Sequence, residues 1–234
     1  MIPWWMTGKD NISFNHALSC GSMMMLGTYN FAMLRMIFGC EPEACLDCDT
    51  TVWKDGVHDK CDYDFNARFR FPGGAIGEAM TTMRGPTLWK PSEARVTTRA
   101  VVVEDGHLPA TQEKLRTRQI TLHGFLHAVV WHRIDIKDSF EIRDRESTEV
   151  VKKWVETSSR KAYTYKAAGG EFVGCKGEDW WMSYRYQMEE FVNRVKGRKT
   201  QHWIDADDSV KQMQMVDMAY EKSGLGVRPT NDFR

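Results

Sequence analysis

The stretch that most constrains the fold of this chain runs from Gly21 to Gly39. Apolar side chains recur in it every three or four positions: Met25, Tyr29, Ala32, Met33 and Met36. That spacing places them on one face of a helix, because an α-helix has about 3.6 residues per turn. Gly39 can adopt the positive φ that ends a helix, and Pro42 prevents its continuation. We therefore predict a helix over residues 22–38 that buries this face.

Segments with the alternating pattern of β-strands follow this helix. Residues 65–71 alternate apolar and polar side chains without a break, which is typical of a half-buried strand. The turn Pro72-Gly73-Gly74 then reverses the chain, so residues 75–82 are expected to return as the second strand of a hairpin. Further strand-like segments are 44–53, 94–103, 119–125, 127–136, 140–143 and 160–165.

Two more helices are predicted near the end of the chain. The first covers residues 179–195, is capped by Gly197, and carries an apolar stripe: Trp181, Tyr184, Met188, Phe191, Val192 and Val195. The second begins at Asp207 or Asp208 and ends at Gly224. Its apolar residues at helical spacing are Val210, Met213, Val216 and Tyr220.

The order of these elements predicts an α+β fold. We expect an irregular lead-in of residues 1–20 and a single domain over residues 21–234. Strands do not alternate regularly with helices, so the domain should contain an open, mainly antiparallel β-sheet with helices on one face. The other sheet face is left without cover from its own chain, and such a face usually packs on a partner subunit. A homodimer through the sheet face is therefore expected.

The charge balance excludes one class of partner. The chain has 32 Lys and Arg against 32 Asp and Glu, so no basic field is expected to hold nucleic acid. No apolar run reaches the length of about 18 residues that would span a membrane. The N-terminus also lacks the basic and apolar regions of a signal peptide. We expect a cytoplasmic protein with neither a nucleic-acid nor a membrane partner.

The six cysteines provide one short motif, Cys45-Leu46-Asp47-Cys48. A C-x-x-C pair is typical of zinc or redox sites, but no second ligand pair and no βαβ pattern accompany it. His123 and His127 would share one strand face, yet they lack a third ligand. We expect free thiols and no metal. The chain also lacks a glycine-rich nucleotide motif, so no dinucleotide site is expected.

Several segments resemble one enzyme family. The segment from Gly21 to Tyr29, followed by Gly39-Cys40-Glu41-Pro42, is similar to the opening of the C-terminal domain of the Gfo/Idh/MocA oxidoreductases. Segments 180–187, 196–198, 208–209 and 218–225 resemble the dihydrodiol and D-xylose dehydrogenase branch, particularly its fungal members. Phe71-Pro72-Gly73-Gly74 and residues 131–135 fit the middle of that domain. The resemblance covers nearly all of residues 8–234.

The resemblance implies an open antiparallel sheet with helices on one side and a face that commonly forms a dimer interface. It also implies an N-terminal Rossmann domain, which holds NAD or NADP and the lysine of a Glu-Lys-Pro motif that assists proton transfer. This chain starts after that domain. No cofactor is therefore expected in it, and the chain should be redox-inactive on its own.

The resemblance places the catalytic candidate at Tyr29. The family motif is Asp-x-Gly-x-His, with tyrosine replacing histidine in the dihydrodiol branch; Gly27 and Tyr29 match it, whereas Met25 stands at the aspartate position. Tyr29 is then the acid/base group or a neutral hydrogen-bond donor. A tyrosine packed in the core is the alternative.

The candidate substrate-binding residues are Met25, Asn30, His132 and Arg133. In a strand, His132 points to one face, whereas Arg133 and Asp135 point to the other. A structural histidine and a surface Arg–Asp pair are the alternatives for these residues. Trp180 and Trp181 are expected to pack in the core.

Three functions stay open at this point. The first is the substrate-binding and oligomerisation half of an NAD(P)-dependent sugar or diol dehydrogenase. The second is a stand-alone, cofactor-independent cyclase, isomerase or dehydratase for a small, largely apolar metabolite. The third is a non-catalytic scaffold partner. The carboxylate missing at Met25 and the missing nucleotide domain favour the second.

Overall fold

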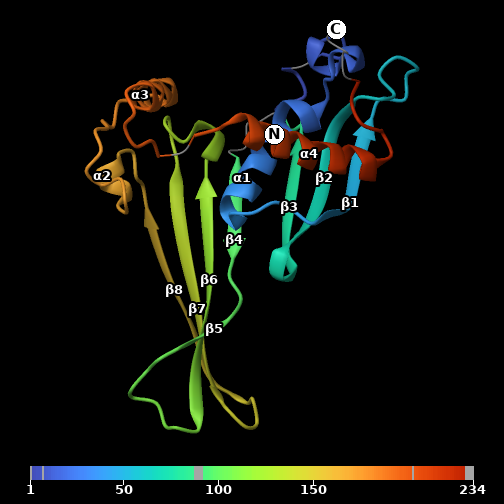
Figure 1. The fold of residues 1–234 in the computed structure, drawn as a ribbon. Coiled ribbons are helices and arrows are strands. Elements are labelled where there is room, and N and C mark those ends of the chain that lie inside the picture. Colours follow the sequence, from blue (N-terminus) through green and yellow to red (C-terminus); the bar gives the residue numbers. More distant parts are fainter. Residues whose placement is uncertain (1, 7, 87–91, 202, 230–234) are drawn as a thin grey trace. The chain divides into compact units, whose positions relative to one another are not determined.

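The computed structural model describes residues 2–6, 8–86, 92–201 and 203–229, and its fold is α+β with open antiparallel sheets (Figure 1). The chain divides into two compact units, Met1–Lys90 with Ile204–Arg234 and Pro91–Trp203. The predicted fold class is confirmed, although the strands form two sheets and not one. That residues 21–234 act as one domain stays a prediction.

The first unit has a three-stranded antiparallel sheet in the order β1-β2-β3. Its strands are β1 (Ala44–Val52), β2 (Asp62–Phe71) and β3 (Ala75–Thr82), and the predicted hairpin at Pro72–Gly74 joins the last two. Helices α1 (Thr28–Phe38) and α4 (Ala206–Ser223) contact β3 and β1. The buried apolar side chains of β2 are those of one face: Phe65, Ala67, Phe69 and Phe71. Both helices therefore cover the same face of this sheet.

The lead-in is more ordered than predicted. Short 3₁₀ turns at Ile12–Phe14 and His16–Leu18 are capped by the side chains of Asn11 and Asn15. Phe14 is buried and packs edge-on against Trp53, with the ring centroids 4.2 Å apart. This segment consequently belongs to the core of the first unit.

The predicted helix exists, but its expected buried face is wrong. A π-helical turn, Met23–Gly27, precedes α1, and the side chains that enter the core are those of Met23 and Phe31. Gly27 lies on the same side, where an added Cβ would be 2.8 Å from the Phe65 ring. Met25 and Tyr29 are exposed instead. Both sides of this helix are apolar, so the spacing of apolar residues does not show which side is buried. Gly27 marks the buried side, because the helix approaches the sheet closely there.

A buried polar network holds the first unit together. The Asp62 carboxylate at the start of β2 accepts hydrogen bonds from the Ser22 hydroxyl and the Met23 amide, both at 2.7 Å. Its other oxygen accepts from the Tyr220 hydroxyl at 3.1 Å and from Arg228 at 2.7 Å. The carboxylate is fully buried, and these four donors replace the water that it loses on folding.

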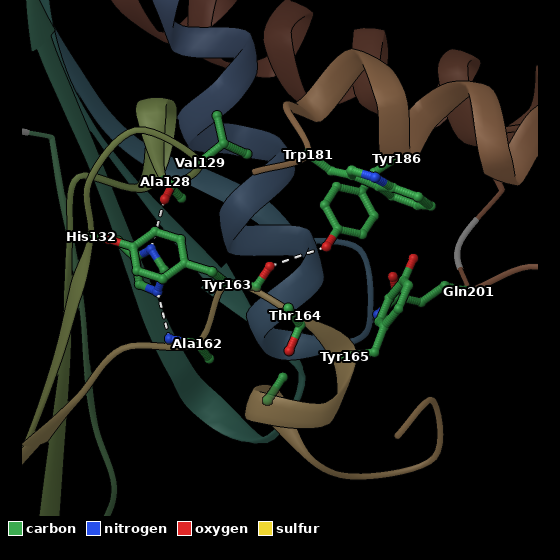
Figure 2. A pocket seen from close by; sticks show the side chains of 11 residues that line it. Ala128, Val129, His132, Ala162, Tyr163, Thr164, Tyr165, Trp181, Tyr186 and Gln201 are labelled. Carbon is green, nitrogen blue, oxygen red and sulfur yellow. Dashed lines mark hydrogen bonds between the residues drawn. The ribbon is translucent and has the colours of Figure 1, made fainter. Parts of the chain in front are cut away.

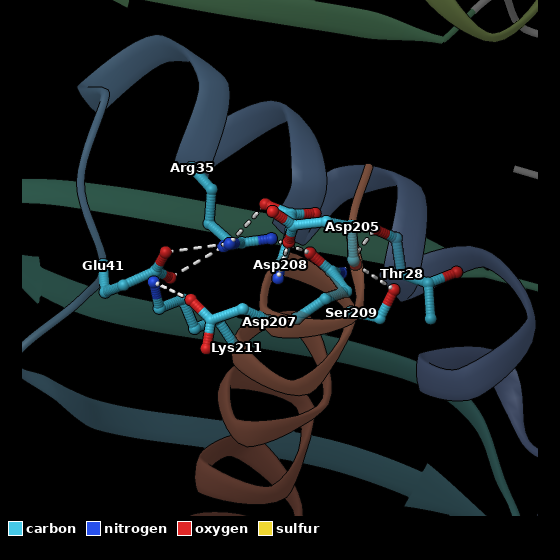
Figure 3. Close-up of polar contacts among 9 residues, drawn as sticks. Thr28, Arg35, Glu41, Asp205, Asp207, Asp208, Ser209 and Lys211 are labelled. Carbon is cyan, nitrogen blue, oxygen red and sulfur yellow. Dashed lines mark hydrogen bonds and ion pairs between the residues drawn. The ribbon is translucent and has the colours of Figure 1, made fainter. Parts of the chain in front are cut away.

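Arg35 joins the two helices of this unit. Its guanidinium pairs in a bidentate manner with Glu41, at 2.7 and 2.8 Å, and reaches Asp208 and Gln212 on α4 at 2.9 and 3.1 Å (Figure 3). The Gln212 amide in turn donates to the Thr28 carbonyl of α1 at 2.9 Å. The contacts with Glu41 and Asp208 raise the pKa of Arg35 above its ordinary value, despite the opposing effect of burial. The guanidinium thus fixes α1 against the first turn of α4.

Helix α4 starts earlier than predicted. Asp205, not Asp207 or Asp208, is the N-cap, and its carboxylate accepts from the Asp208 amide at 2.8 Å. Gly224 ends the helix in the left-handed region, as predicted. Of the expected apolar stripe, Val216 and Tyr220 are buried, whereas Val210 and Met213 are exposed.

The second unit has an antiparallel sheet in the order β4-β6-β7-β8, with β5 paired to β6. The strands are β4 (Glu93–Thr97), β5 (Val101–Val103), β6 (Gln112–His123), β7 (Arg133–Asp144) and β8 (Val150–Arg160). The predicted strand over 127–136 is wrong in its first half, because Gly124 turns the chain and a 3₁₀ turn follows at Phe125–His127. The prediction over 160–165 is also wrong, since Thr164 caps the short helix α2 (Tyr165–Ala168).

Helix α3 (Ser183–Val195) turns its predicted apolar stripe outward. Tyr184 is 81% exposed, and Met188, Phe191 and Val195 are exposed with it. Trp181 is buried just before the helix, as expected, but Trp180 is exposed. The helix instead directs Tyr186 and Glu190 toward the segment 163–165, where they make hydrogen bonds that the apolar pattern did not predict.

The two faces of the second sheet differ in character. Strand register places one set of apolar side chains on the same face: Val96, Ile120, Leu122, Ile134, Ile136, Phe140, Ile142 and Trp154. This face also carries charged side chains, among them Lys114, Arg116, Lys152, Glu156, Arg160 and the ion pair Arg118–Asp138. On that face the Phe140 and Trp154 rings stack at 4.9 Å. The opposite face carries ion pairs such as Arg143–Glu113 and Lys153–Glu141. We call these the mixed face and the paired-charge face.

Within the described part of the chain, none of the helices has the length and apolar character needed to cross a lipid bilayer.

Candidate functional site

The outer side of α1 carries the catalytic candidate. Tyr29 follows the π-helical turn Met23–Gly27, and its side chain is 56% exposed. Its hydroxyl makes no hydrogen bond to any other described residue, which leaves it available to a ligand. Turns of this kind are frequent at functional sites. Tyr29 is therefore presented on the surface of the first unit and is not a core tyrosine.

Two predicted substrate-binding residues lie beside Tyr29 in the sequence, with different surroundings. Met25 is one turn earlier and 42% exposed, so it offers an apolar neighbour to the phenol. The Asn30 side chain donates from Nδ2 to the Met80 carbonyl of β3 at 2.9 Å. That hydrogen bond joins α1 to β3. A ligand could therefore contact Asn30 through its side-chain oxygen.

The third predicted residue, His132, is only 5% exposed and lies in the second unit (Figure 2). Its Nε2 accepts a hydrogen bond from the Ala162 amide at 2.9 Å, so Nδ1 carries the proton and donates to the Ala128 carbonyl at 2.6 Å. The two bonds join the turn before β7 to the segment after β8. Contact between a His132 nitrogen and a substrate would require one of them to break.

Arg133 lies on the paired-charge face, as the strand pattern predicts. Its guanidinium pairs with Asp135 at 2.9 Å, and Asp135 also contacts His123 Nε2 at 3.1 Å. Partial burial raises the pKa of Asp135, but the pairs with Arg133 and His123 outweigh it and leave this pKa below its usual value. Among the described residues, no three His, Cys, Asp or Glu side chains are placed to hold a metal ion.

A cavity of about 240 Å³ lies beside His132 in the second unit. Its walls are aromatic and aliphatic, with two further polar side chains, Thr164 and Gln201. The aromatic rings that line it are those of His132, Tyr163, Tyr165, Trp181 and Tyr186. Figure 2 shows Trp181 and Tyr186 together on one side of it and Tyr163, Thr164 and Tyr165 on consecutive positions of the chain.

Hydrogen bonds fix the tyrosines of this cavity. The Tyr186 hydroxyl donates to the carbonyls of Tyr163 and Glu178 at 3.1 and 3.2 Å. The Tyr165 hydroxyl donates to Glu190 Oε1 at 3.4 Å. Burial, followed by the nearby Glu190 charge, raises the pKa of Tyr165 to about 12. Burial likewise raises the pKa of Tyr186. Both phenols are therefore neutral at physiological pH.

The cysteines are free thiols, as predicted. Burial raises the pKa of Cys45 to about 11 and that of Cys48 to about 12. The thiolate is the nucleophile and metal ligand, so these two thiols are unreactive near neutral pH.

The predicted site residues thus fall into both units. Met25 and Tyr29 share the outer side of α1, whereas His132 and Arg133 point to opposite sides of a strand end in the second unit. Sequence reasoning missed Tyr163, Tyr165, Tyr186 and Gln201. The one available signal was the pair of tyrosines in Tyr163-Thr164-Tyr165, a segment that was predicted as a strand.

Comparison with solved structures finds a similar fold. Aldose-aldose oxidoreductase from Caulobacter crescentus, crystallised with glycerol, matches 93% of this chain with a TM-score of 0.54 and 12% identity. The similarity is one of fold. The chain spans 50% of the length of that oxidoreductase chain. No protein-family model and no curated protein sequence matches this chain.

Proposed function

We propose that this chain is the substrate-binding and oligomerisation domain of a homologue of the Gfo/Idh/MocA sugar or diol dehydrogenases, redox-inactive without a nucleotide-binding partner domain. Two independent findings support the assignment: the sequence motifs of residues 21–29 and 218–225, and the fold shared with half of an aldose-aldose oxidoreductase. The observation that carries it is the exposed hydroxyl of Tyr29 at the motif position of the acid/base group.

The chemistry available to Tyr29 is limited by its neighbours. A phenol hydroxyl donates a hydrogen bond, and it needs a neighbouring base or cation to act as a base itself. Met25 supplies no carboxylate to orient it. Tyr29 then binds a substrate hydroxyl or carbonyl oxygen, and removal of a proton needs a base or a cation from another domain.

NAD or NADP does not fit the described residues. Dinucleotide sites use a glycine-rich turn between a parallel strand and a helix. All pairings between the named strands here are antiparallel, and no such turn precedes α1, α3 or α4 in the described ranges. We therefore assign no step of hydride transfer to this chain.

The apolar cluster on the mixed face of the second sheet is the proposed core of a dimer interface. Its aliphatic residues and the stacked Phe140–Trp154 pair form a patch of the kind that interface cores use. A stable interface also needs about 800 Å² from each partner. The test is sedimentation of Trp154→Glu and of Val155→Glu, whose site lies on the opposite face. Monomer formation by Trp154→Glu alone supports the proposal; a wild-type protein that is monomeric at micromolar concentration contradicts it.

Binding of D-xylose tests the role of Tyr29. In a calorimetric titration, Tyr29→Phe should weaken xylose binding about three- to tenfold, the value of one neutral hydrogen bond. Tyr184→Phe removes another exposed phenol from α3 and should leave the affinity unchanged. Equal affinities in wild type and Tyr29→Phe would remove Tyr29 from the site.

A fluorescence titration with NADH tests whether the chain has a nucleotide site. We expect no binding, and a micromolar affinity for NADH would show that such a site exists.

The apolar Met25 beside Tyr29 favours one alternative, a cofactor-independent cyclase, isomerase or dehydratase for a small apolar metabolite. The same titration with cyclohexanone distinguishes the two. Tyr29-dependent binding of cyclohexanone in the absence of xylose binding supports the alternative, since the ketone offers one hydrogen-bond acceptor on an otherwise apolar ring.

A further inference from the structure

We propose that the cavity beside His132 is a second small-molecule site, selective for an uncharged aromatic ring that carries one hydroxyl group, a phenol. It lies wholly in the second unit, and its lining residues come from the turn before β7, the segment after β8, and the region around α3. None of them belongs to the candidate site at Tyr29.

The size of the cavity sets the size of its ligand. A cavity of about 150 Å³ admits benzene in a protein interior. The cavity here, at about 240 Å³, is open to solvent on one side and has room for one substituted ring. Small-molecule sites are concave and mostly apolar, with a few polar groups that fix orientation, and this lining has that composition.

The walls favour an aromatic ring. Tyr186 packs edge-on against both Tyr165 and Trp181, with centroids 5.5 and 5.2 Å away. The His132 and Tyr163 rings lie 4.4 Å apart on another side. An inserted ring meets aromatic edges and faces in the offset and edge-to-face arrangements that such rings prefer.

The polar groups select a hydroxyl. The Tyr186 hydroxyl uses its proton on two backbone carbonyls, so its oxygen is left to accept a hydrogen bond from a ligand. The Thr164 hydroxyl accepts from the Ala167 amide at 3.0 Å and keeps its own proton to donate. A ligand hydroxyl is both donor and acceptor, so it can satisfy groups of both kinds.

Charge and extra polarity are excluded. Among the described residues, no charged side chain lines the cavity, and the Glu190 carboxylate is bonded to the Tyr165 hydroxyl, so an anion would lose its hydration without gaining a positively charged partner. A sugar fits in size, but most of its hydroxyls would face Ala128, Val129, Ala162 and Ala168 without a hydrogen-bond partner.

The test is a titration of the whole protein with phenol, followed by NMR at the indole N–H of Trp181, which the variant Trp181→Phe identifies. We expect a saturable shift with a dissociation constant of about 1 mM, within the range for a ligand of this size. Toluene should bind about five- to tenfold more weakly, since it lacks the hydroxyl. Sodium benzoate and D-xylose should produce no saturable shift.

Two neighbouring alanines of α2 give a matched pair of variants. Both are exposed, but only Ala168 lines the cavity, so leucine at this position enters it, whereas leucine at Ala167 does not. Ala168→Leu should weaken phenol binding about tenfold, and Ala167→Leu should leave it within about twofold. Amide spectra of both variants confirm the fold.

Three results would overturn the proposal: no saturable shift with phenol, equal binding losses in the two alanine variants, or benzoate binding as tight as that of phenol. None of these measurements depends on xylose, NADH or Tyr29. The proposed function and this second site can therefore fail separately.

Discussion

The Tyr220 hydroxyl lies 3.1 Å from Asp62 Oδ1 and donates a hydrogen bond to it, across 158 positions of the sequence. The same carboxylate oxygen accepts from Arg228 at 2.7 Å, and the Arg228 guanidinium stacks 4.2 Å above the Tyr220 ring. The last helix and the segment after it are thereby joined to the start of β2. An added Cβ at Gly21 would lie 2.3 Å from the same oxygen, which explains a glycine there.

Asp62→Ala should lower the free energy of unfolding by about 3–5 kcal/mol, because it leaves the Arg228 charge buried without a partner. Tyr220→Phe removes one hydrogen bond and should cost about 1–2 kcal/mol. Urea unfolding measures both. The control is Glu93→Ala, which breaks an exposed pair with Arg95 and should cost less than about 1 kcal/mol. If Asp62→Ala lost no more unfolding free energy than Glu93→Ala, the proposed contribution of the buried network to stability would be wrong.

Gly27→Ala tests the close approach of helix and sheet. The new Cβ would lie 2.8 Å from the Phe65 ring, so we expect a loss of about 1–3 kcal/mol, larger than the gain in helix propensity of about 1 kcal/mol. Adding Phe65→Leu should restore part of the stability by making room. Gly106→Ala, where no atom lies within 4 Å, should cause no loss. Thermal unfolding gives the comparison, and a neutral Gly27→Ala would show that the contact is loose.

Arg35→Lys should destabilise the protein by about 1–2 kcal/mol, although the charge is kept. A lysine cannot reproduce the bidentate contact with Glu41 while reaching Asp208 and Gln212. The control is Arg68→Lys, since the Arg68–Asp47 pair is also bidentate but exposed, and its loss should be less than about 1 kcal/mol. If Arg35→Lys and Arg68→Lys lowered the urea midpoint equally, the buried position of Arg35 would add no stability.

Tyr165 predicts an alkaline loss of stability. Its pKa is about 12 in the folded protein against about 10 in the unfolded chain. The folded state therefore binds the proton more tightly; the resulting stability is complete below pH 10 and falls as the pH rises toward 12. Between these values, Tyr165→Phe should lose less stability than wild type. Denaturant unfolding at a series of pH values measures the slopes, and identical slopes would contradict the raised pKa.

Where local signals are strong, the sequence was sufficient to predict the element. Pro72-Gly73-Gly74 and the strict alternation before it led to the observed hairpin, with Phe71 paired to Ala75. The glycines after α1 and α4 end both helices in the left-handed region. Strand β8 was missed, because Lys152 and Lys153 interrupt the alternation on a strand that is exposed along most of its length.

The candidate site was less accessible to prediction. The face of α1 was misassigned because this helix is apolar on more than one side, and packing against Phe65 decided the outcome. The face of α3 was misassigned because hydrogen bonds of Tyr186 and Glu190, and not its apolar stripe, orient it. The cavity combines residues from three separated segments, including Tyr165 and Ala168 of α2 and Tyr186 of α3, so no single periodic pattern marks it. Only the position of Tyr29 was available from the motif, and the structure adds that this residue is exposed.

The π-helical turn Met23–Gly27 contains one more residue than an α-helical turn would. Deleting a single residue from it would rotate every following side chain of α1 by about 100° about the helix axis. Phe31 would leave the core, and Tyr29 would no longer point outward. A lineage that carries this helix can thus gain or lose a displayed phenol through one codon's insertion or deletion, an event that leaves the identity of every remaining amino acid unchanged.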